Sequence, residues 1–186
     1  MIDPNDVTKF DRSEAELQEF WLFACVVAGK TAKTQARLLE GFLTALPEPH
    51  NTPFNRVERA YLDGLLDERL RESRLGQYNR LSKCFVESLK VDLQTASVQD
   101  LERIHGIGPK TARFFLMHSR PNQRIAALDT HILKFLKEKE HTDITMTPAS
   151  SKKYLELELR FLELADLAQM SPADFDLQIW KSYANR

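Results

Sequence analysis

Apolar residues recur at helical spacing near the start of the chain. Five of them fall on one face of a helix with 3.6 residues per turn, namely Leu17, Phe20, Trp21, Ala24 and Ala28. Ser13 and Glu16 stand before this stripe at the spacing of a capping box, in which each side chain bonds the other residue's backbone N–H. Gly29 follows the stripe. We therefore predict an amphipathic helix that begins after Ser13 and ends before Gly29.

Similar signals continue along the chain. Apolar spacing predicts helices through residues 38–43, ending before Pro47, and through residues 81–89. Ser97 is expected to cap a short helix. Ser and Thr are favoured just before a helix, and proline is favoured in its first turn. Three dipeptides therefore predict further helix starts: Thr52-Pro53, Thr147-Pro148 and Ser171-Pro172.

One segment fits two kinds of structure. Residues 155–159 alternate between Leu and Glu, as a half-buried strand would. Tyr154, Leu157 and Phe161 keep helical spacing, so a helix is favoured. The sequence has no β-hairpin turn between two alternating segments, no internal repeat and no low-complexity segment. The pattern as a whole predicts an all-α fold.

Composition limits the classes of function. The 186 residues are 42% hydrophobic and 9% aromatic, which suits a globular protein with a sizeable core. The sequence has no apolar run of membrane-spanning length, and residues 1–6 are polar and acidic, unlike a signal peptide. We therefore expect a cytoplasmic protein. Because 26 Lys and Arg oppose 27 Asp and Glu, any DNA binding must rest on local basic groups and backbone N–H donors.

Cysteine and acidic residues carry weaker signals. Cys25 and Cys84 lie in apolar segments and are expected to be buried free thiols. Two cysteines and five scattered histidines do not predict an iron–sulfur cluster or a zinc site. Acidic residues gather near the C-terminal end, where they predict a solvated helix face; they are Glu156, Glu158, Glu163 and Asp166.

A glycine-rich segment between two predicted helices is the first candidate site. Residues 104–112 have the sequence Ile-His-Gly-Ile-Gly-Pro-Lys-Thr-Ala. Gly106 and Gly108 can adopt backbone angles closed to other residues, and amides here and at the start of the next helix suit a phosphate oxygen. The alternative is an ordinary tight turn. We predict a hairpin that binds DNA phosphates, with Gly106, Ile107, Gly108 and Thr111 at the contact.

Lys110 and Asp129 are the candidate catalytic residues. Lys110 can be a simple phosphate contact, or a neutral amine that attacks a sugar carbon and forms a Schiff base. Its place in the first turn of a helix predicts a lowered pKa, because the helix field disfavours the ammonium ion. Asp129 can be a helix N-cap, yet the apolar residues 125–128 before it would hold its carboxylate in a fixed position. There it can accept a proton or stabilise positive charge in the transition state.

Together these motifs resemble the helix-hairpin-helix DNA glycosylases, a superfamily that includes endonuclease III and the 8-oxoguanine DNA glycosylases. The hairpin with Lys110 and the Leu-Asp-Thr-His stretch at 128–131 carry the resemblance. It implies that Lys110 is the Schiff-base lysine and Asp129 the essential aspartate. The segment Phe20–Gly29 followed by Lys30 resembles the first barrel helix and the loop that fills the gap left by a flipped base. Lys30 is therefore an expected DNA contact.

Within the superfamily, residues 125–134 and the short chain look most like the compact microbial 8-oxoguanine glycosylases. Those enzymes have an Asp and a Trp one turn apart on a C-terminal helix, and a chain end near the base pocket. Asp176 and Trp180 fit this spacing, and Arg186 ends the sequence. The resemblance implies that these three residues form the base pocket. Trp180 alone would equally suit a core aromatic residue, and the tail after it is shorter than in those relatives.

The resemblance implies a two-lobed all-α fold with a cleft between the lobes. A six-helix barrel lobe with the hairpin would cover residues 20–125, and residues 1–19 plus 126–186 would form the second lobe. The expected protein is a monomer that excises an oxidised base, 8-oxoguanine, from double-stranded DNA and nicks the strand by β-elimination, without metal or organic cofactor and without membrane association. Two alternatives stay open: the same chemistry on an oxidised pyrimidine or an abasic site, and a non-catalytic DNA-binding module.

Overall fold

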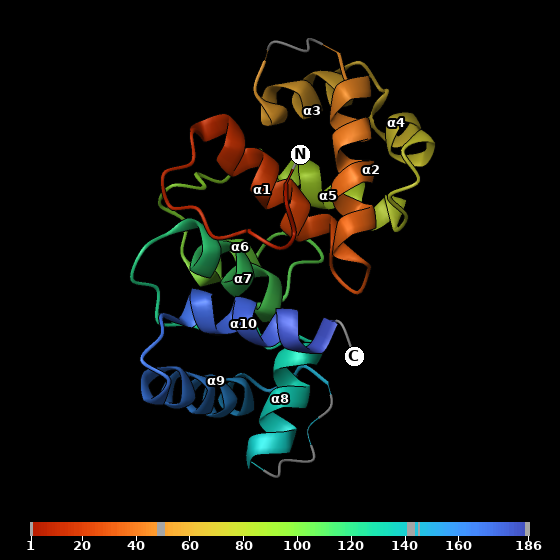
Figure 1. Ribbon diagram of the computed structural model, residues 1–186. Coiled ribbons are helices and arrows are strands. Elements are labelled where there is room, and N and C mark those ends of the chain that lie inside the picture. Colours follow the sequence, from red (N-terminus) through yellow and green to blue (C-terminus); the bar gives the residue numbers. More distant parts are fainter. Residues whose placement is uncertain (1, 48–50, 141–143, 145, 185–186) are drawn as a thin grey trace.

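Helices make up the regular structure of the chain. The computed structural model describes residues 2–47, 51–140, 144 and 146–184, and this part holds ten α-helices and no strand (Figure 1). The helices are α1 (Glu14–Val26), α2 (Ala32–Ala45), α3 (Pro53–Leu62), α4 (Leu66–Glu72), α5 (Tyr78–Ser88), α6 (Val98–Glu102), α7 (Pro109–Ser119), α8 (Thr130–Glu140), α9 (Ser151–Leu167) and α10 (Pro172–Ala184). The predicted all-α class is confirmed.

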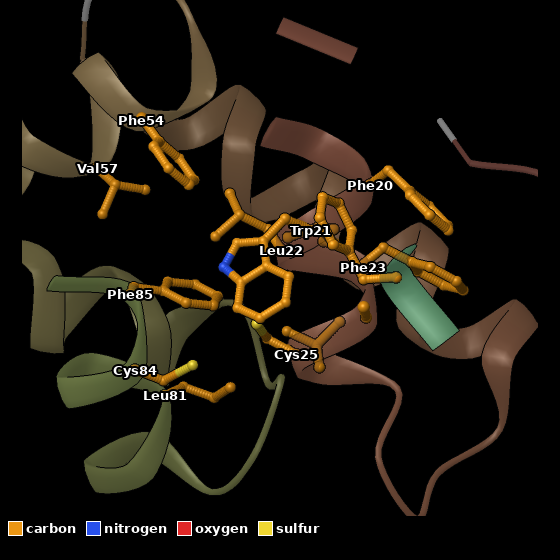
Figure 2. Packing of buried hydrophobic residues seen from close by; sticks show 14 of the residues in the cluster. Phe20, Trp21, Leu22, Phe23, Cys25, Phe54, Val57, Leu81, Cys84 and Phe85 are labelled. Atoms are coloured by element: carbon orange, nitrogen blue, oxygen red, sulfur yellow. The ribbon is translucent and has the colours of Figure 1, made fainter. Parts of the chain in front are cut away.

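Helix α1 is the central helix of the N-terminal half. The predicted capping box is present, because the Ser13 side chain accepts from the Glu16 amide and the Glu16 side chain accepts from the Ser13 amide. The helix contacts α2, α3, α5 and α7. For this reason it is buried on all sides from Phe20 to Val26, and the predicted one-sided stripe is too narrow. Figure 2 shows Trp21 within this core; its indole N–H donates to the Ser88 hydroxyl at 2.8 Å.

Apolar side chains form two main clusters. The first takes in buried residues from Val7 to Leu116, and includes α1, α2, α5 and α7. The second lies between Ala126 and Ile179, on α8, α9 and α10. Met117, Ala127 and Ala173 form a small third cluster. Helix α10 contacts α7 as well as α8 and α9, so it joins the two halves (Figure 1). The lobe boundaries given above stay a prediction.

Two expectations for the C-terminal half are wrong. Helix α9 begins at Ser151, where the Ser150 hydroxyl accepts from the Lys153 amide, so Thr147-Pro148 is not its start. The Thr147 hydroxyl instead donates to the Leu128 carbonyl at 2.8 Å. The acidic residues of α9 do not all face solvent, because Glu158 is buried. Residues 155–159 are helical, as the spacing of their neighbours predicts.

The remaining helix signals are confirmed. Thr52 caps α3 ahead of Pro53, Ser97 caps α6, and the Ser171 hydroxyl accepts from the Asp174 amide at the start of α10. Cys25 and Cys84 are buried free thiols. Among the helices of the described residues, none has the length and apolar character needed to cross a membrane.

Candidate active site

A cavity of about 880 Å³ lies where the two halves of the molecule meet. Its walls come from six places in the chain: the N-terminal segment, the end of α1 with the turn into α2, α7, the start of α8, Thr147 before α9, and α10. The predicted residues Lys30, Lys110, Asp129, Asp176 and Trp180 all line it. These positions span almost the whole sequence, and the fold brings them to one place.

Lys110 lies in the first turn of α7 and is half-buried. Burial lowers the pKa of Lys110, while the carboxylates of Asp129 and Asp176 act in the opposite direction. The direction agrees with the prediction, but the main cause is loss of solvent rather than the field of the helix. A lysine with a lowered pKa has a larger fraction of neutral amine near neutral pH, and only the neutral amine is a nucleophile.

Asp129 caps a helix and also lines the cavity. Its Oδ1 accepts from the amides of His131 and Ile132, both at 2.9 Å, so it caps α8. Its carboxylate also borders the cavity beside Lys110. Burial and the nearby charge of Asp176 raise the pKa of Asp129, against the Ile132 amide and the charge of Lys110. A carboxylate with a raised pKa is a stronger proton acceptor than one in water.

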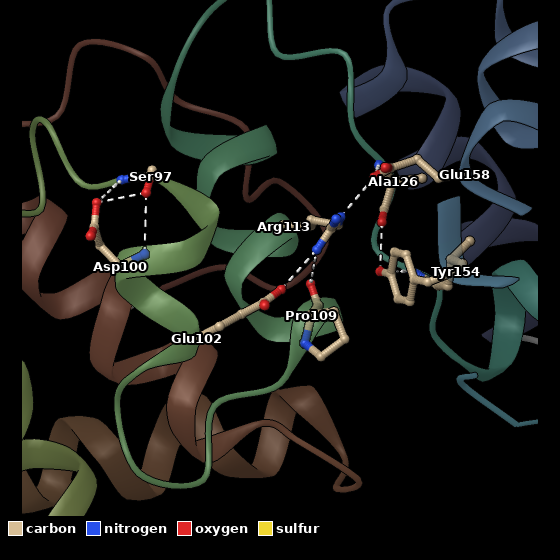
Figure 3. A network of polar contacts seen from close by, with 9 residues as sticks. Ser97, Asp100, Glu102, Pro109, Arg113, Ala126, Tyr154 and Glu158 are labelled. Carbon is tan, nitrogen blue, oxygen red and sulfur yellow. Dashed lines mark hydrogen bonds and ion pairs between the residues drawn. The ribbon is translucent and has the colours of Figure 1, made fainter. Parts of the chain in front are cut away.

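A polar network holds the segment before Asp129 (Figure 3). The Tyr154 hydroxyl donates to the Ala126 carbonyl at 2.8 Å and accepts from the Leu128 amide at 3.2 Å. Glu158 Oε1 accepts from the Ala126 amide and from Arg113 Nε, both at 2.8 Å. Arg113 also reaches Glu102 at 3.0 Å. Because Arg113 lies on α7, the network ties the helix of Lys110 to the segment of Asp129.

The predicted hairpin connects α6 and α7. Gly106 has φ +76°, and a Cβ there would lie 2.6 Å from Cγ of Arg80, so glycine is required. Gly108 has φ −106° and open space around it, which corrects the expectation that both glycines need special angles. The Ile107 amide donates to the Ile104 carbonyl and the buried Thr111 donates its amide to the Gly108 carbonyl.

Arg80 holds this hairpin against α1. Its guanidinium donates to the Gly106 carbonyl at 3.3 Å and to the Cys25 carbonyl at 2.9 Å. In the described part of the chain, the amides of Gly106, Gly108 and Lys110 make no hydrogen bond. These three donors are the ones that the hairpin offers to an anion.

The residues predicted for the base pocket, and the predicted DNA contact Lys30, differ in their surroundings. Trp180 is half-buried, with its ring 6.2 Å from that of His131 in an edge-to-face arrangement, so it is a wall residue rather than part of the closed core. Asp176 is 6% exposed. Lys30 donates its ammonium to the Leu75 carbonyl, and burial lowers its pKa. Arg186 lies outside the described residues.

Comparisons with known proteins agree with this architecture. The sequence profile of the family described as 8-oxoguanine DNA glycosylase matches residues 65–170, more than half of the chain. The chain belongs to this family. An 8-oxoguanine DNA glycosylase/AP lyase of Picrophilus torridus is 41% identical over 80 residues, which are 43% of this chain and 37% of that protein. The protein of the same name from Methanocaldococcus jannaschii is 32% identical over 80 residues, 43% of this chain and 38% of the relative.

Solved structures of this family extend the likeness to almost the whole chain. The crystal structure of the 8-oxoguanine DNA glycosylase of Thermotoga maritima matches with a TM-score of 0.70 and 25% identity, over 95% of this chain and 83% of that one. The Methanocaldococcus jannaschii 8-oxoguanine glycosylase/lyase, solved in complex with a 15mer DNA containing 8-oxoguanine, matches with a TM-score of 0.71 and 22% identity, over 95% and 84% of the two chains. The predicted helix-hairpin-helix glycosylase fold is confirmed.

The family profile and the cavity overlap only in part. Residues 65–170 contain Lys110 and Asp129, whereas Asp176 and Trp180 lie beyond them. The residues of the site that were not predicted include Phe114, which lines the cavity, and His118, which is fully buried behind it. Both follow Lys110 at intervals of four along α7. That spacing, which places side chains on one helical face, is the sequence signal that identifies them.

Proposed function

We propose that this protein is a bifunctional DNA glycosylase and AP lyase that removes 8-oxoguanine from double-stranded DNA. The observation that carries the proposal is that Lys110 and Asp129 line the same cavity and interact electrostatically, with the pKa of the amine lowered and that of the carboxylate raised. A nucleophilic amine beside a proton acceptor is the arrangement that a Schiff-base mechanism needs. Membership of the family and the activities for which its relatives are named point the same way.

The proposed reaction begins when the damaged nucleotide leaves the base stack and enters the cavity. The neutral Lys110 amine attacks C1′ of the deoxyribose, so a C1′–Nζ bond forms and the bond from C1′ to the base breaks. Asp129 takes the proton released by the amine, and the departing base takes up a proton from water. The C1′–O4′ bond of the sugar then breaks, O4′ takes the proton from Asp129, and an iminium ion forms between Lys110 and C1′. Loss of a C2′ proton and of the 3′ phosphate by β-elimination nicks the strand.

The base would be held by residues of α7 and α10. The rings of Trp180 and Phe114 border the cavity and offer flat surfaces on which a purine can stack, an interaction of roughly 1–3 kcal/mol per base. Asp176 offers a carboxylate oxygen. The N7–H of 8-oxoguanine can donate to it, whereas guanine has no hydrogen at N7. A buried acceptor left without a donor disfavours the normal base, which gives the pocket its selectivity.

The protein would bind DNA through contacts with the phosphate backbone rather than through sequence-specific contacts with the bases. The free amides of Gly106, Gly108 and Lys110 suit a phosphate oxygen at the start of α7. Lys30 and Lys33 add positive charge at the cavity wall. We propose that the protein acts on DNA as a monomer in the cytoplasm. Its two lobes would have the boundaries predicted above. The alternative of a non-catalytic DNA-binding module uses the same hairpin but gives no reason for Asp129 beside Lys110.

An excision panel tests the proposed substrate. Duplexes carrying 8-oxoguanine, thymine glycol, uracil or an abasic site are incubated with excess enzyme, and released base and strand nicking are measured separately. We expect release of 8-oxoguanine well above the other bases, and nicking of the abasic duplex. Preferred release of thymine glycol would overturn the substrate while leaving the lysine chemistry intact. Activity on the abasic duplex alone would reduce the function to a lyase, and no activity on any duplex would favour a binding module.

A further inference from the structure

A chain of hydrogen bonds lies directly behind the base cavity. His118 Nε2 is 3.2 Å from Oδ2 of Asp176 on α10, and His118 Nδ1 is 2.8 Å from the Thr8 hydroxyl in the N-terminal segment. The imidazole is fully buried on α7. Three segments that are far apart in the sequence therefore meet at one side chain.

The chemistry of the carboxylate sets the direction of the hydrogen bond to Asp176. An ionised carboxylate can only accept, so the contact with Asp176 requires a proton on His118 Nε2. A ring that carries its proton on Nε2 alone accepts at Nδ1 from the Thr8 hydroxyl. Each partner thus specifies the ring's tautomer and orientation, in the way that a second hydrogen bond orients a histidine in other sites.

His118 also supports the second aromatic wall of the cavity. Its ring meets that of Phe114 edge to face, with centroids 4.9 Å apart, and Phe114 lines the cavity. The backbone around His118 is equally well held. Its carbonyl accepts from the Lys9 amide at 3.1 Å and from the Arg12 guanidinium at 2.8 Å. The N-terminal segment, which contributes Pro4 and Asn5 to the cavity wall, is anchored at this point.

Asp176 is held through one of its two oxygens only. In the described part of the chain Oδ2 bonds His118, and Oδ1 makes no hydrogen bond. Because Asp176 lines the cavity, Oδ1 is the oxygen left for a ligand. A carboxylate anchored in this way presents its acceptor oxygen in one direction. A carboxylate that rotates freely loses conformational entropy when the base binds, which weakens binding.

We propose that His118, itself held by Thr8, is a positioning residue that orients Asp176 toward the flipped base. The inference rests on the proposed function, since it assigns Asp176 to base recognition. His118 does not touch the reacting atoms. It therefore contributes to selection of the damaged base and not to the Schiff-base chemistry on a sugar that has already lost its base.

Single-turnover rates on two substrates separate these contributions. For His118→Phe, excision of 8-oxoguanine should fall at least about tenfold, the scale of a hydrogen bond to a charged group, while nicking of a preformed abasic site should stay within about threefold. His118→Gln, whose amide nitrogen can replace Nε2, should recover most of the excision rate. Thr8→Val, which removes only the hydroxyl, should give a smaller loss with the same substrate dependence.

Ser119→Ala is the matched control. Ser119 is the neighbouring buried residue of α7, and its hydroxyl donates to the Phe115 carbonyl at 2.6 Å, away from Asp176. It should lower the melting temperature without changing the ratio of the two rates. Equal losses on both substrates for His118→Phe, or the same ratio change in Ser119→Ala, would overturn the proposal. If His118→Phe does not fold, Thr8→Val decides, because an unchanged ratio there contradicts the inference.

A measurement that needs no lesion keeps this inference apart from the proposed function. The imidazole ¹⁵N NMR signals of His118 are identified as those that are present in the labelled wild-type protein and absent in His118→Gln. These signals should show a protonated Nε2. An unprotonated Nε2 would overturn the hydrogen-bond chain whatever the substrate. Conversely, absence of 8-oxoguanine excision in the wild-type protein, with a protonated Nε2, would contradict the proposed substrate and leave the arrangement of His118 and Asp176 standing.

Discussion

In the proposed mechanism, Asp129 has two roles for one side chain. It caps α8 through the amides of His131 and Ile132, and it presents a carboxylate to Lys110. A cap needs only an oxygen acceptor, which Asn supplies nearly as well as Asp. Proton acceptance needs the charge. The two roles can therefore be separated by a substitution that keeps the shape and removes the charge.

We predict that Asp129→Asn lowers 8-oxoguanine excision at least about a hundredfold, the scale of losing one positioned acid–base group, with little change in melting temperature. Ser171→Ala is the control, since it removes a cap at the exposed start of α10. It should lower the free energy of unfolding by about 1 kcal/mol and leave excision unchanged. A large loss of stability in Asp129→Asn with full activity would show that Asp129 is only a cap.

Asp176 gives a prediction for the pH dependence. Its charge raises the pKa of Lys110 and that of Asp129. Schiff-base formation on an abasic site requires neutral Lys110 and therefore increases as pH rises through the lysine pKa. In Asp176→Asn the ammonium ion loses a stabilising charge, so the lysine pKa falls further and the rise in rate should move to lower pH.

Single-turnover trapping rates between pH 5 and pH 10 measure this shift. Asp174→Asn removes a charge from the same helix on its exposed side, and its profile should match that of the wild-type protein. A rise displaced to higher pH in Asp176→Asn, or no displacement, would mean that the Asp176 carboxylate does not act on Lys110.

At the scale of elements, the helix starts are predicted most reliably, from the capping residues and the prolines beside them. Ser13, Thr52, Ser97 and Ser171 begin helices as predicted, because these side chains bond amides within their own turn. The predictions are wrong where tertiary packing decides which side chains are buried. Helix α1 is buried on all sides because neighbouring helices surround it. Glu158 is buried because Arg113, 45 residues earlier, pairs with it.

The Arg113–Glu158 pair joins α7 to α9 and should matter for stability and geometry together. Removing one partner leaves a buried charge unpaired, so Arg113→Met should lower the free energy of unfolding by about 3 kcal/mol. The excision rate should also fall, since the segment before Asp129 loses part of its support. Urea denaturation and single-turnover kinetics measure the two effects.

Arg124→Met is the matched control for this pair. This substitution breaks the ion pair between Arg124 and Asp166, whose side chains are 59% and 57% exposed, respectively. Exposed pairs contribute roughly 0–1 kcal/mol, so stability and activity should both change little. Equal effects of the two substitutions would show that the buried network does not position Asp129.

At the scale of the whole molecule, sequence motifs indicate the proposed catalytic pair but not the cavity around it. Lys110 and Asp129 are 19 residues apart and sit in local patterns. The contact between His118 and Thr8 spans 110 residues, and that between His118 and Asp176 spans 58. No local pattern encodes such contacts, since they depend on how α7, α10 and the N-terminal segment pack. Spacing along α7 marks Phe114 and His118 only once Lys110 is known to face the cavity.

The central claim is that Lys110 is the nucleophile. Lys30 is the alternative amine in the same cavity. Both lysines line the cavity and burial lowers the pKa of each. Lys30 donates its ammonium to the Leu75 carbonyl, whereas Lys110 faces two carboxylates. The direct measurement is borohydride trapping on an 8-oxoguanine duplex, followed by digestion and mass spectrometry of the crosslinked peptide. We predict an adduct on Lys110 that is lost in Lys110→Gln and retained in Lys30→Gln; an adduct on Lys30, or undiminished trapping by Lys110→Gln, would contradict the account.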